Sequence, residues 1–156
     1  MHLVNDDERL MREALKEAQR ALERGEVPVG AVAARDGVII ARGHNLRETL
    51  RDPTAHAEMI ALRQASQVLQ GWRLLSVTLY CTLEPCAMCA AAMVHARLSR
   101  LVYGASDPKS GAAGSALNLT ASPQLNHRIE VVAGVLAEES AALLARFFAG
   151  LREPAE

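Results

Sequence analysis

Four side chains in two short segments have the types and spacing of a metal centre. His56 and Glu58 are two residues apart, and Cys86 and Cys89 follow as a Cys-x-x-Cys pair. One imidazole and two thiols are ligands that suit zinc. Three protein ligands leave the fourth position of a tetrahedral zinc ion open to water, which is typical of catalytic zinc. The pattern therefore predicts one zinc ion per chain, bound by His56, Cys86 and Cys89.

Glu58 is expected to act beside the metal rather than on it. Residues two apart on a regular helix diverge by about 200°, so His56 and Glu58 cannot both reach one ion from the middle of a helix. Zinc with two thiolates and a neutral imidazole carries no net charge, and an anionic fourth ligand would close the site. We therefore predict that Glu58 carries protons to and from a zinc-bound water.

Two other interpretations of the cysteine pair remain open. A redox pair is less favoured, because Ala87 and Met88 differ from the usual thioredoxin dipeptide. A closed structural zinc site would need a fourth ligand, for which the sequence offers four candidates: His44, Cys81, His95 and His127. Of these, Cys81 lies in an apolar run and is expected to be a buried small side chain.

Size and composition predict a single domain over residues 1–156. Half of the chain is apolar, but no apolar run approaches the roughly 20 residues of a membrane span. The first nine residues include three acidic ones and lack the apolar core of a signal peptide. Three cysteines are too few for a secreted disulfide framework. These features predict a cytoplasmic protein that does not enter a membrane.

The charge distribution is uneven although the net charge is only −1. Residues 42–110, which include the predicted metal ligands, carry eight basic and five acidic side chains. Of the 17 basic residues, 15 are arginine, whose planar fork suits phosphate and stacks on bases. Two interpretations stay open: a basic surface for nucleic acid, or ordinary solvated charges.

Apolar periodicity predicts an α/β protein. Helices are expected over residues 6–24, 55–69, 86–97 and 138–151, and strands over 27–35, 38–43, 75–82, 100–105 and 129–135. Asp36-Gly37 is a hairpin signal, and Thr54 is a candidate N-cap. Residues 45–54 and 106–128 are expected to be loops, the second with one helical turn. The predicted architecture is a mixed five-stranded sheet with helices on both faces.

The signature His-x-Glu…Pro-Cys-x-x-Cys is that of zinc-dependent base deaminases as a wide group. Further segments narrow the resemblance, which extends from about Glu8 to Arg152, to the bacterial tRNA-specific adenosine deaminases. These segments are Val27-Pro-Val-Gly-Ala-Val32, Asp52-Pro-Thr-Ala-His-Ala-Glu58, Thr82-Leu-Glu-Pro-Cys-Ala-Met-Cys89, Gly111-Ala-Ala-Gly-Ser115, Asn126-His-Arg128 and Ala142-Leu-Leu-Ala-Arg-Phe-Phe148. The fold implied is that of the cytidine deaminase-like group, a three-layer α/β/α arrangement.

The resemblance implies hydrolytic deamination of adenosine to inosine at the wobble position of a tRNA anticodon, chiefly that of an arginine tRNA. It implies zinc bound by the three ligands above. Glu58 would take a proton from the zinc-bound water and deliver it to ring N1 of the base. Members of the family form homodimers, with the active site close to the interface.

The resemblance also implies contacts with the substrate. Asn45 would hydrogen-bond the flipped nucleoside, and the backbone N–H of Ala57 would contact the base edge. Asp107 would lie near the anticodon loop. We expect Val29 and Ala57 to line a narrow apolar pocket that suits a flat purine.

Two departures from the family pattern bear on RNA binding. The tail, residues 151–156, is short and acidic, whereas many relatives end in a basic stretch. Residues 46–51 are not a family signature, and no contacts are assigned to them. Two rival functions share the zinc pattern: a deaminase of free bases or nucleosides such as guanine or cytidine, and a non-catalytic RNA-binding module stabilised by zinc.

Overall fold

The computed structural model describes residues 3–152. The first two residues of the chain lie outside this range. Residues 153–156, which make up most of the short acidic tail noted in the sequence, lie outside it as well. Within it the chain forms the following elements: α1 (Leu3–Glu23), β1 (Gly30–Arg35), β2 (Val38–His44), α2 (Arg47–Leu50), α3 (Ala57–Leu69), β3 (Val77–Leu83), α4 (Ala87–His95), β4 (Arg100–Ala105), β5 (Glu130–Ala133) and α5 (Ala137–Arg152).

The strands form one mixed sheet in the order β2-β1-β3-β4-β5. Strand β1 is antiparallel to both β2 and β3, whereas β3, β4 and β5 run parallel. The turn between β1 and β2 has positive φ at both Asp36 (52°) and Gly37 (77°), as a type I′ hairpin requires. The predicted α/β class, five-stranded sheet and hairpin are confirmed.

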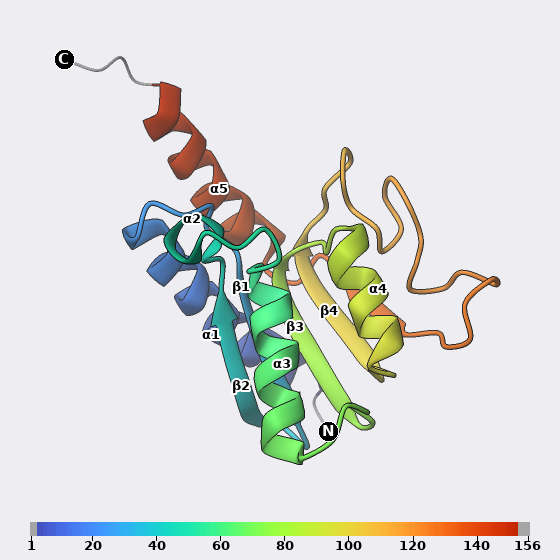
Figure 1. Cartoon of the computed structure of the whole chain (residues 1–156). Coiled ribbons are helices and arrows are strands. Elements are labelled where there is room, and N and C mark those ends of the chain that lie inside the picture. The colour runs from blue at the N-terminus through green and yellow to red at the C-terminus, as the bar shows by residue number, and fades with distance from the viewer. Residues whose placement is uncertain (1–2, 153–156) are drawn as a thin grey trace.

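Helices cover both faces of the sheet, as the sequence predicted (Figure 1). Helices α3 and α4 pack on one face, over a core rich in alanine that includes Ala31, Ala33 and Leu79. Helix α1 packs on the other face against a smaller core that includes Val32 and Tyr80, and α5 contacts both α1 and β4. Because side chains alternate between the two faces along β1, Ala31 and Ala33 lie in the first core and Val32 lies in the second.

Small residues let α3 approach the sheet closely near the end of β2. A Cβ atom on Gly43 would lie 2.6 Å from the carbonyl oxygen of Ala57 and 3.1 Å from the backbone nitrogen of Ala61. A side chain at Gly43 would therefore push the first turn of α3 away from the sheet. This contact fixes where α3 begins, and with it the position of His56 and Glu58.

At one end of the sheet, the last residues of β2, β3 and β4 lie beside the first residues of β1. Because β1 is antiparallel to its neighbours, it begins where β2 and β3 end, and β4 ends at the same edge as β3. Ligands of open α/β sheets bind at the carboxyl ends of the parallel strands. The segments that leave β2, β3 and β4 here begin with Asn45, Glu84 and Ser106.

Three local expectations were wrong. Helix α3 begins at Ala57 with His56 in the N-cap position, and Thr54 instead donates from Nα and Oγ1 to Asp52 Oδ1 over 2.8 and 2.7 Å. The expected loop 45–54 contains the short helix α2, which is too brief to show a periodic apolar pattern. Residues 106–128 contain no helical turn, only turns and one isolated bridge. None of the helices between residues 3 and 152 has the length and apolar character to cross a membrane.

Candidate active site

The start of α3 and the start of α4 bring the three predicted metal ligands together. His56 is the N-cap residue of α3, and Cys86 is the N-cap residue of α4, with Cys89 in the first turn. His56 Nδ1 lies 3.6 Å from Cys86 Sγ and 3.5 Å from Cys89 Sγ. The three ligand atoms all lie within 4.8 Å of one another. Both helix starts also present free N–H groups and positive dipole ends, which favour anionic thiolates.

These distances fit a zinc ion. Bonds of about 2.3 Å to sulfur and 2.0–2.1 Å to nitrogen at a tetrahedral angle would place the two ligand atoms about 3.5 Å apart. The nitrogen–sulfur distances in the structure are of this size. A nitrogen and two thiols also form the softer donor set that selects zinc over magnesium or calcium.

The other candidates for a fourth ligand lie elsewhere in the part of the chain that the structure describes. Cys81 is fully buried within β3, and His44 Nδ1 lies 3.0 Å from Glu17 Oε1. His95 is the last residue of α4, and His127 Nε2 is 2.7 Å from the carbonyl oxygen of Leu98. The group of potential ligands contains none of them. The geometry therefore favours three protein ligands over a closed structural site.

Glu58 lies on the first turn of α3 and is 4% exposed. Burial penalises its charged form and raises the pKa of its carboxyl group to about 7. The group of atoms close enough to share one metal ion does not include this carboxylate. A buried carboxyl group with a pKa near neutrality can both accept and donate a proton at physiological pH.

The ligand side chains themselves are electrostatically coupled. The hydrogen bond with Cys89, reinforced by one with His56, lowers the pKa of the Cys86 thiol to about 3. The pKa of Cys89 moves upward because the neighbouring Cys86 takes the negative charge, and burial adds to the effect. The hydrogen bond with Cys86 raises the pKa of His56. One thiolate is thus stabilised even before a metal ion is bound, as a zinc ligand must be.

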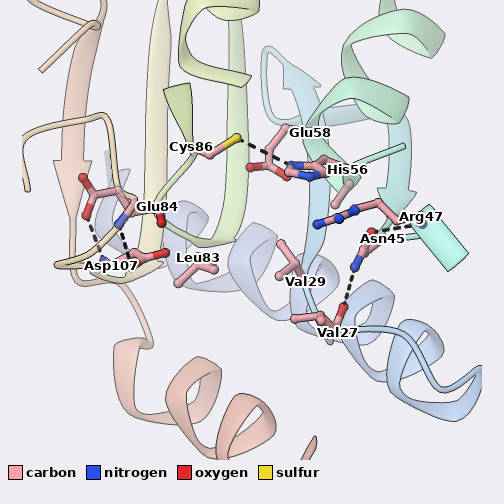
Figure 2. Close-up of a pocket in the computed structure, with 12 residues that line it drawn as sticks. Val27, Val29, Asn45, Arg47, His56, Glu58, Leu83, Glu84, Cys86 and Asp107 are labelled. Carbon is pink, nitrogen blue, oxygen red and sulfur yellow. Dashed lines mark hydrogen bonds between the residues drawn. The ribbon is translucent and has the colours of Figure 1, made fainter. Parts of the chain in front are cut away.

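A cavity of about 280 Å³ opens beside these side chains (Figure 2). It is lined by all four predicted substrate-contacting residues (Val29, Asn45, Ala57 and Asp107) and by His56, Glu58 and Cys86. Sequence reasoning missed five further lining residues: Val27, Arg47, Leu83, Glu84 and Ser110. All five stand within two residues of a predicted site residue or of a family segment, and Val27, Leu83 and Glu84 lie inside such segments. Proximity to the motifs was therefore the available signal.

Asn45 and Ala57 face the cavity from fixed backbone positions. Asn45 is 7% exposed, donates from Nδ2 to the carbonyl oxygen of Val27 over 3.3 Å and accepts from the backbone N–H of Arg47 over 3.2 Å. Ala57 is the first residue of α3, so its N–H has no acceptor within the helix. Both residues line the cavity, and the two hydrogen bonds hold the Asn45 amide in a defined orientation.

The opposite side of the cavity is formed by the loop after β4. Asp107 donates its backbone N–H to Glu84 Oε1 over 3.0 Å, and its Oδ1 accepts from the backbone N–H groups of Lys109 and Ser110. Burial would raise the pKa of Glu84, but the hydrogen bonds from Ser115 and from three backbone N–H groups outweigh it and lower the pKa. Figure 2 shows Asp107 and Glu84 facing His56 and Glu58 across the cavity.

The fold and the facing helix starts define a deaminase. The model of the MafB19-like deaminase family matches residues 5–152. The tRNA-specific adenosine deaminase of Bacillus subtilis (strain 168) is 51% identical over 150 residues, which cover 96% of this chain and 93% of the relative. The chain belongs to the family of tRNA-specific adenosine deaminases.

Solved structures agree with this assignment. One of them comes from biochemical and structural studies of A-to-I editing by tRNA:A34 deaminases at the wobble position of transfer RNA. This structure superposes on the chain with a TM-score of 0.84 at 48% sequence identity. It covers 87% of this chain and 99% of the solved one. The guanine deaminase from Nitrosomonas europaea is more distant, with a TM-score of 0.77, 26% identity and coverage of 91% and 84%.

Proposed function

We propose that this enzyme converts adenosine to inosine at the wobble position of a tRNA anticodon, using one zinc ion held by His56, Cys86 and Cys89. The observation that carries the proposal is that one cavity joins this ligand group to the buried carboxyl group of Glu58. The identity to tRNA-specific adenosine deaminases over almost the whole chain supports the substrate.

The residues of the chain divide the reaction between them. Zinc, when bound, would lower the pKa of water and so supply a nucleophile at neutral pH. The Glu58 carboxylate takes one proton from the attacking water and delivers it to ring N1, while the water oxygen bonds to C6. Glu58 then moves the remaining proton from the C6 hydroxyl to the amino nitrogen N6, the C6–N6 bond breaks, ammonia leaves, and inosine with its C6 carbonyl remains. Asn45 and the Ala57 N–H hold the base, and the apolar side chain of Val29 supports its face.

A flipped base explains the shape of the site. The cavity holds about 280 Å³, which is room for a nucleoside but not for a stacked duplex. An unpaired base in an anticodon loop is the least costly to splay out into such a cavity. On this account Asp107 and Arg47, at the rim, would meet the neighbouring nucleotides.

A second candidate function is deamination of a free purine, because the fold also matches a guanine deaminase. The two candidate functions differ in the substrate: the reacting base is part of an RNA loop in the first and a free purine in the second. The metal-loaded enzyme should form inosine in an arginine-tRNA anticodon stem-loop with adenosine at the wobble position, and should leave guanine and free adenosine unchanged at equal concentration. Conversion of the free purine, with no inosine in the RNA, would instead establish the second function.

The arginine tRNA and the homodimer remain predictions from the family resemblance, and the cytoplasmic location remains a prediction from the composition. A panel of anticodon stem-loops would test the first, and light scattering of the purified enzyme the second. Inosine at position 34 in tRNA from cells that lack the gene would contradict the assignment of this enzyme to that tRNA.

A further inference from the structure

Glu84 is a buried carboxylate that the proposed reaction does not use. It is 2% exposed and stands at the end of β3, just before the Pro85-Cys86 segment. Oε1 accepts from the backbone N–H of Asp107 over 3.0 Å, and Oε2 accepts from those of Ala113 and Ser115 over the same distance. The Ser115 hydroxyl donates to Oε1 as well.

The loop after β4 is therefore wrapped around the Glu84 carboxylate. Converging backbone N–H groups of this kind form an anion-binding nest in many proteins, but here the anion belongs to the chain itself. The fit leaves no spare room, because a Cβ atom on Gly111 would overlap both the Glu84 carboxyl group and the carbonyl oxygen of Asp107. The backbone N–H of Ala112 also donates to the Pro85 carbonyl oxygen over 2.8 Å.

The opposite side of the cavity has a matching arrangement. Glu26 is 1% exposed and accepts from the backbone N–H of Glu48 over 3.2 Å. It also accepts from the backbone N–H and the hydroxyl of Thr49, both over 2.7 Å. These N–H groups belong to the first turn of α2, whose N-cap residue Leu46 makes no capping bond. A carboxylate from another segment thus caps the helix that carries Arg47.

We propose that Glu84 and Glu26 are positioning residues that hold opposite walls of the cavity in the shape that accepts an RNA nucleotide. Glu84 fixes the wall with Asp107 and Ser110, and Glu26 fixes the wall with Arg47. Figure 2 shows Asp107 and Arg47 on opposite sides of the cavity. The role rests on the proposed function and refines it. Because the hydrogen bonds given for both carboxylates go to the walls and not to the predicted metal ligands, the walls govern substrate binding more than the chemical step.

Replacing one oxygen of each carboxylate, which can only accept hydrogen bonds, by an amide NH2 group that donates them is the direct test. In Glu84→Gln and Glu26→Gln, the KM for the anticodon stem-loop should rise about tenfold, while kcat stays within about threefold and zinc content is unchanged. Asp7→Asn is the matched control, because Asp7 is also buried and pairs with Arg100 at the other end of β4. It should lower the melting temperature and leave KM unchanged.

Limited trypsin digestion gives a readout that does not depend on activity. Lys109 is exposed between the lining residues Asp107 and Ser110, and Arg51 is exposed at the end of α2. Glu84→Gln should accelerate cleavage after Lys109, and Glu26→Gln cleavage after Arg51, each without effect on the other site. Wild-type KM and wild-type cleavage in both variants would overturn the proposal.

A third variant covers the case in which Glu84→Gln does not fold. Gly111→Ala leaves the carboxylate in place and displaces the loop, so it should raise KM in the same way, and an unchanged KM would count against the role of Glu84. Failure of the proposed function would look different, since the wild-type enzyme would then itself form no inosine.

Discussion

His56 and Glu58 show how two residues only two apart can serve one reaction centre from different sides. His56 has an extended backbone conformation (φ −75°, ψ 153°) and lies outside the helix, whereas Glu58 belongs to the first turn of α3. The angular divergence expected within a helix therefore does not apply to this pair. The imidazole turns toward the thiols, and the carboxyl group is buried beside the cavity.

The first prediction concerns the proton carrier. Glu58→Gln keeps the size of the side chain but removes its basic oxygen, so inosine formation should fall by at least about 10²-fold. Zinc content and fold should be retained, because the proposed ligands are unchanged. Metal analysis and single-turnover assays on the stem-loop measure both effects. Glu138→Gln, an exposed residue of α5, is the control and should keep full activity. Loss of zinc from Glu58→Gln would show that the carboxylate is a ligand.

At the scale of elements, the metal site joins the starts of α3 and α4, which otherwise contact each other only lightly. Because the three proposed ligands come from two helices, binding of the metal ion should increase the free energy of unfolding. Removing zinc with a chelator should lower the melting temperature by at least about 5 °C. Differential scanning fluorimetry with and without the chelator measures this shift.

Cys86→Ser is the matched control for the chelator experiment. It should melt near the temperature of the metal-free wild type and should not respond to the chelator. An equal response of wild type and Cys86→Ser would mean that the ion binds elsewhere.

The Glu26 carboxylate gives helix α2 a dependence on pH. Burial would raise its pKa, but the hydrogen bonds from Thr49 and Glu48 prevail and hold the pKa of Glu26 below its ordinary value of 4.5. A carboxyl group with a lowered pKa in the folded state stabilises the protein above the unfolded pKa, and this contribution is lost as the pH falls through the folded pKa. The stability advantage of wild type over Glu26→Gln should therefore shrink below about pH 4.5. Urea titrations of both proteins between pH 3 and 7 measure it, and a constant difference would contradict the pKa shift.

The sequence sufficed for the elements with strong periodic patterns and for the prediction that His56, Cys86 and Cys89 lie together. It failed where long-range contacts decide. Thr54 has the side chain of an N-cap, but His56 takes that position in the folded chain. The roles of Glu26 and Glu84 depend on partners 22 to 31 residues away, which no local pattern reveals. Arg47 faces the cavity only because α2 forms.

At the scale of the whole molecule, the basic excess of residues 42–110 is smaller than the residue count suggests. Arg42 forms ion pairs with Glu13 and Glu17, and Arg100 with Asp7. These two guanidinium groups are held against α1 rather than offered to a phosphate. Of the remaining basic residues, Arg47 lines the cavity, Arg51 follows it at the end of α2, and Lys109 stands between the lining residues Asp107 and Ser110. Phosphate contacts near the site would thus come from a few cations.

A few phosphate contacts imply a shallow dependence of RNA binding on salt. Each neutralised phosphate contributes about −0.7 to the slope of log K against log salt for a single strand, so a stem-loop bound through these cations should give a slope of about −2. Arg47→Ala should weaken binding and make the slope shallower by about 0.7. Arg9→Ala removes the same charge beside Gly37, at the other end of β1, and should leave the slope unchanged. Fluorescence anisotropy between 50 and 300 mM salt, about the range over which screening changes most, measures all three proteins. Equal slopes for Arg47→Ala and wild type would exclude Arg47 from phosphate contact, and a flat wild-type response would remove the basic walls from the account of RNA binding.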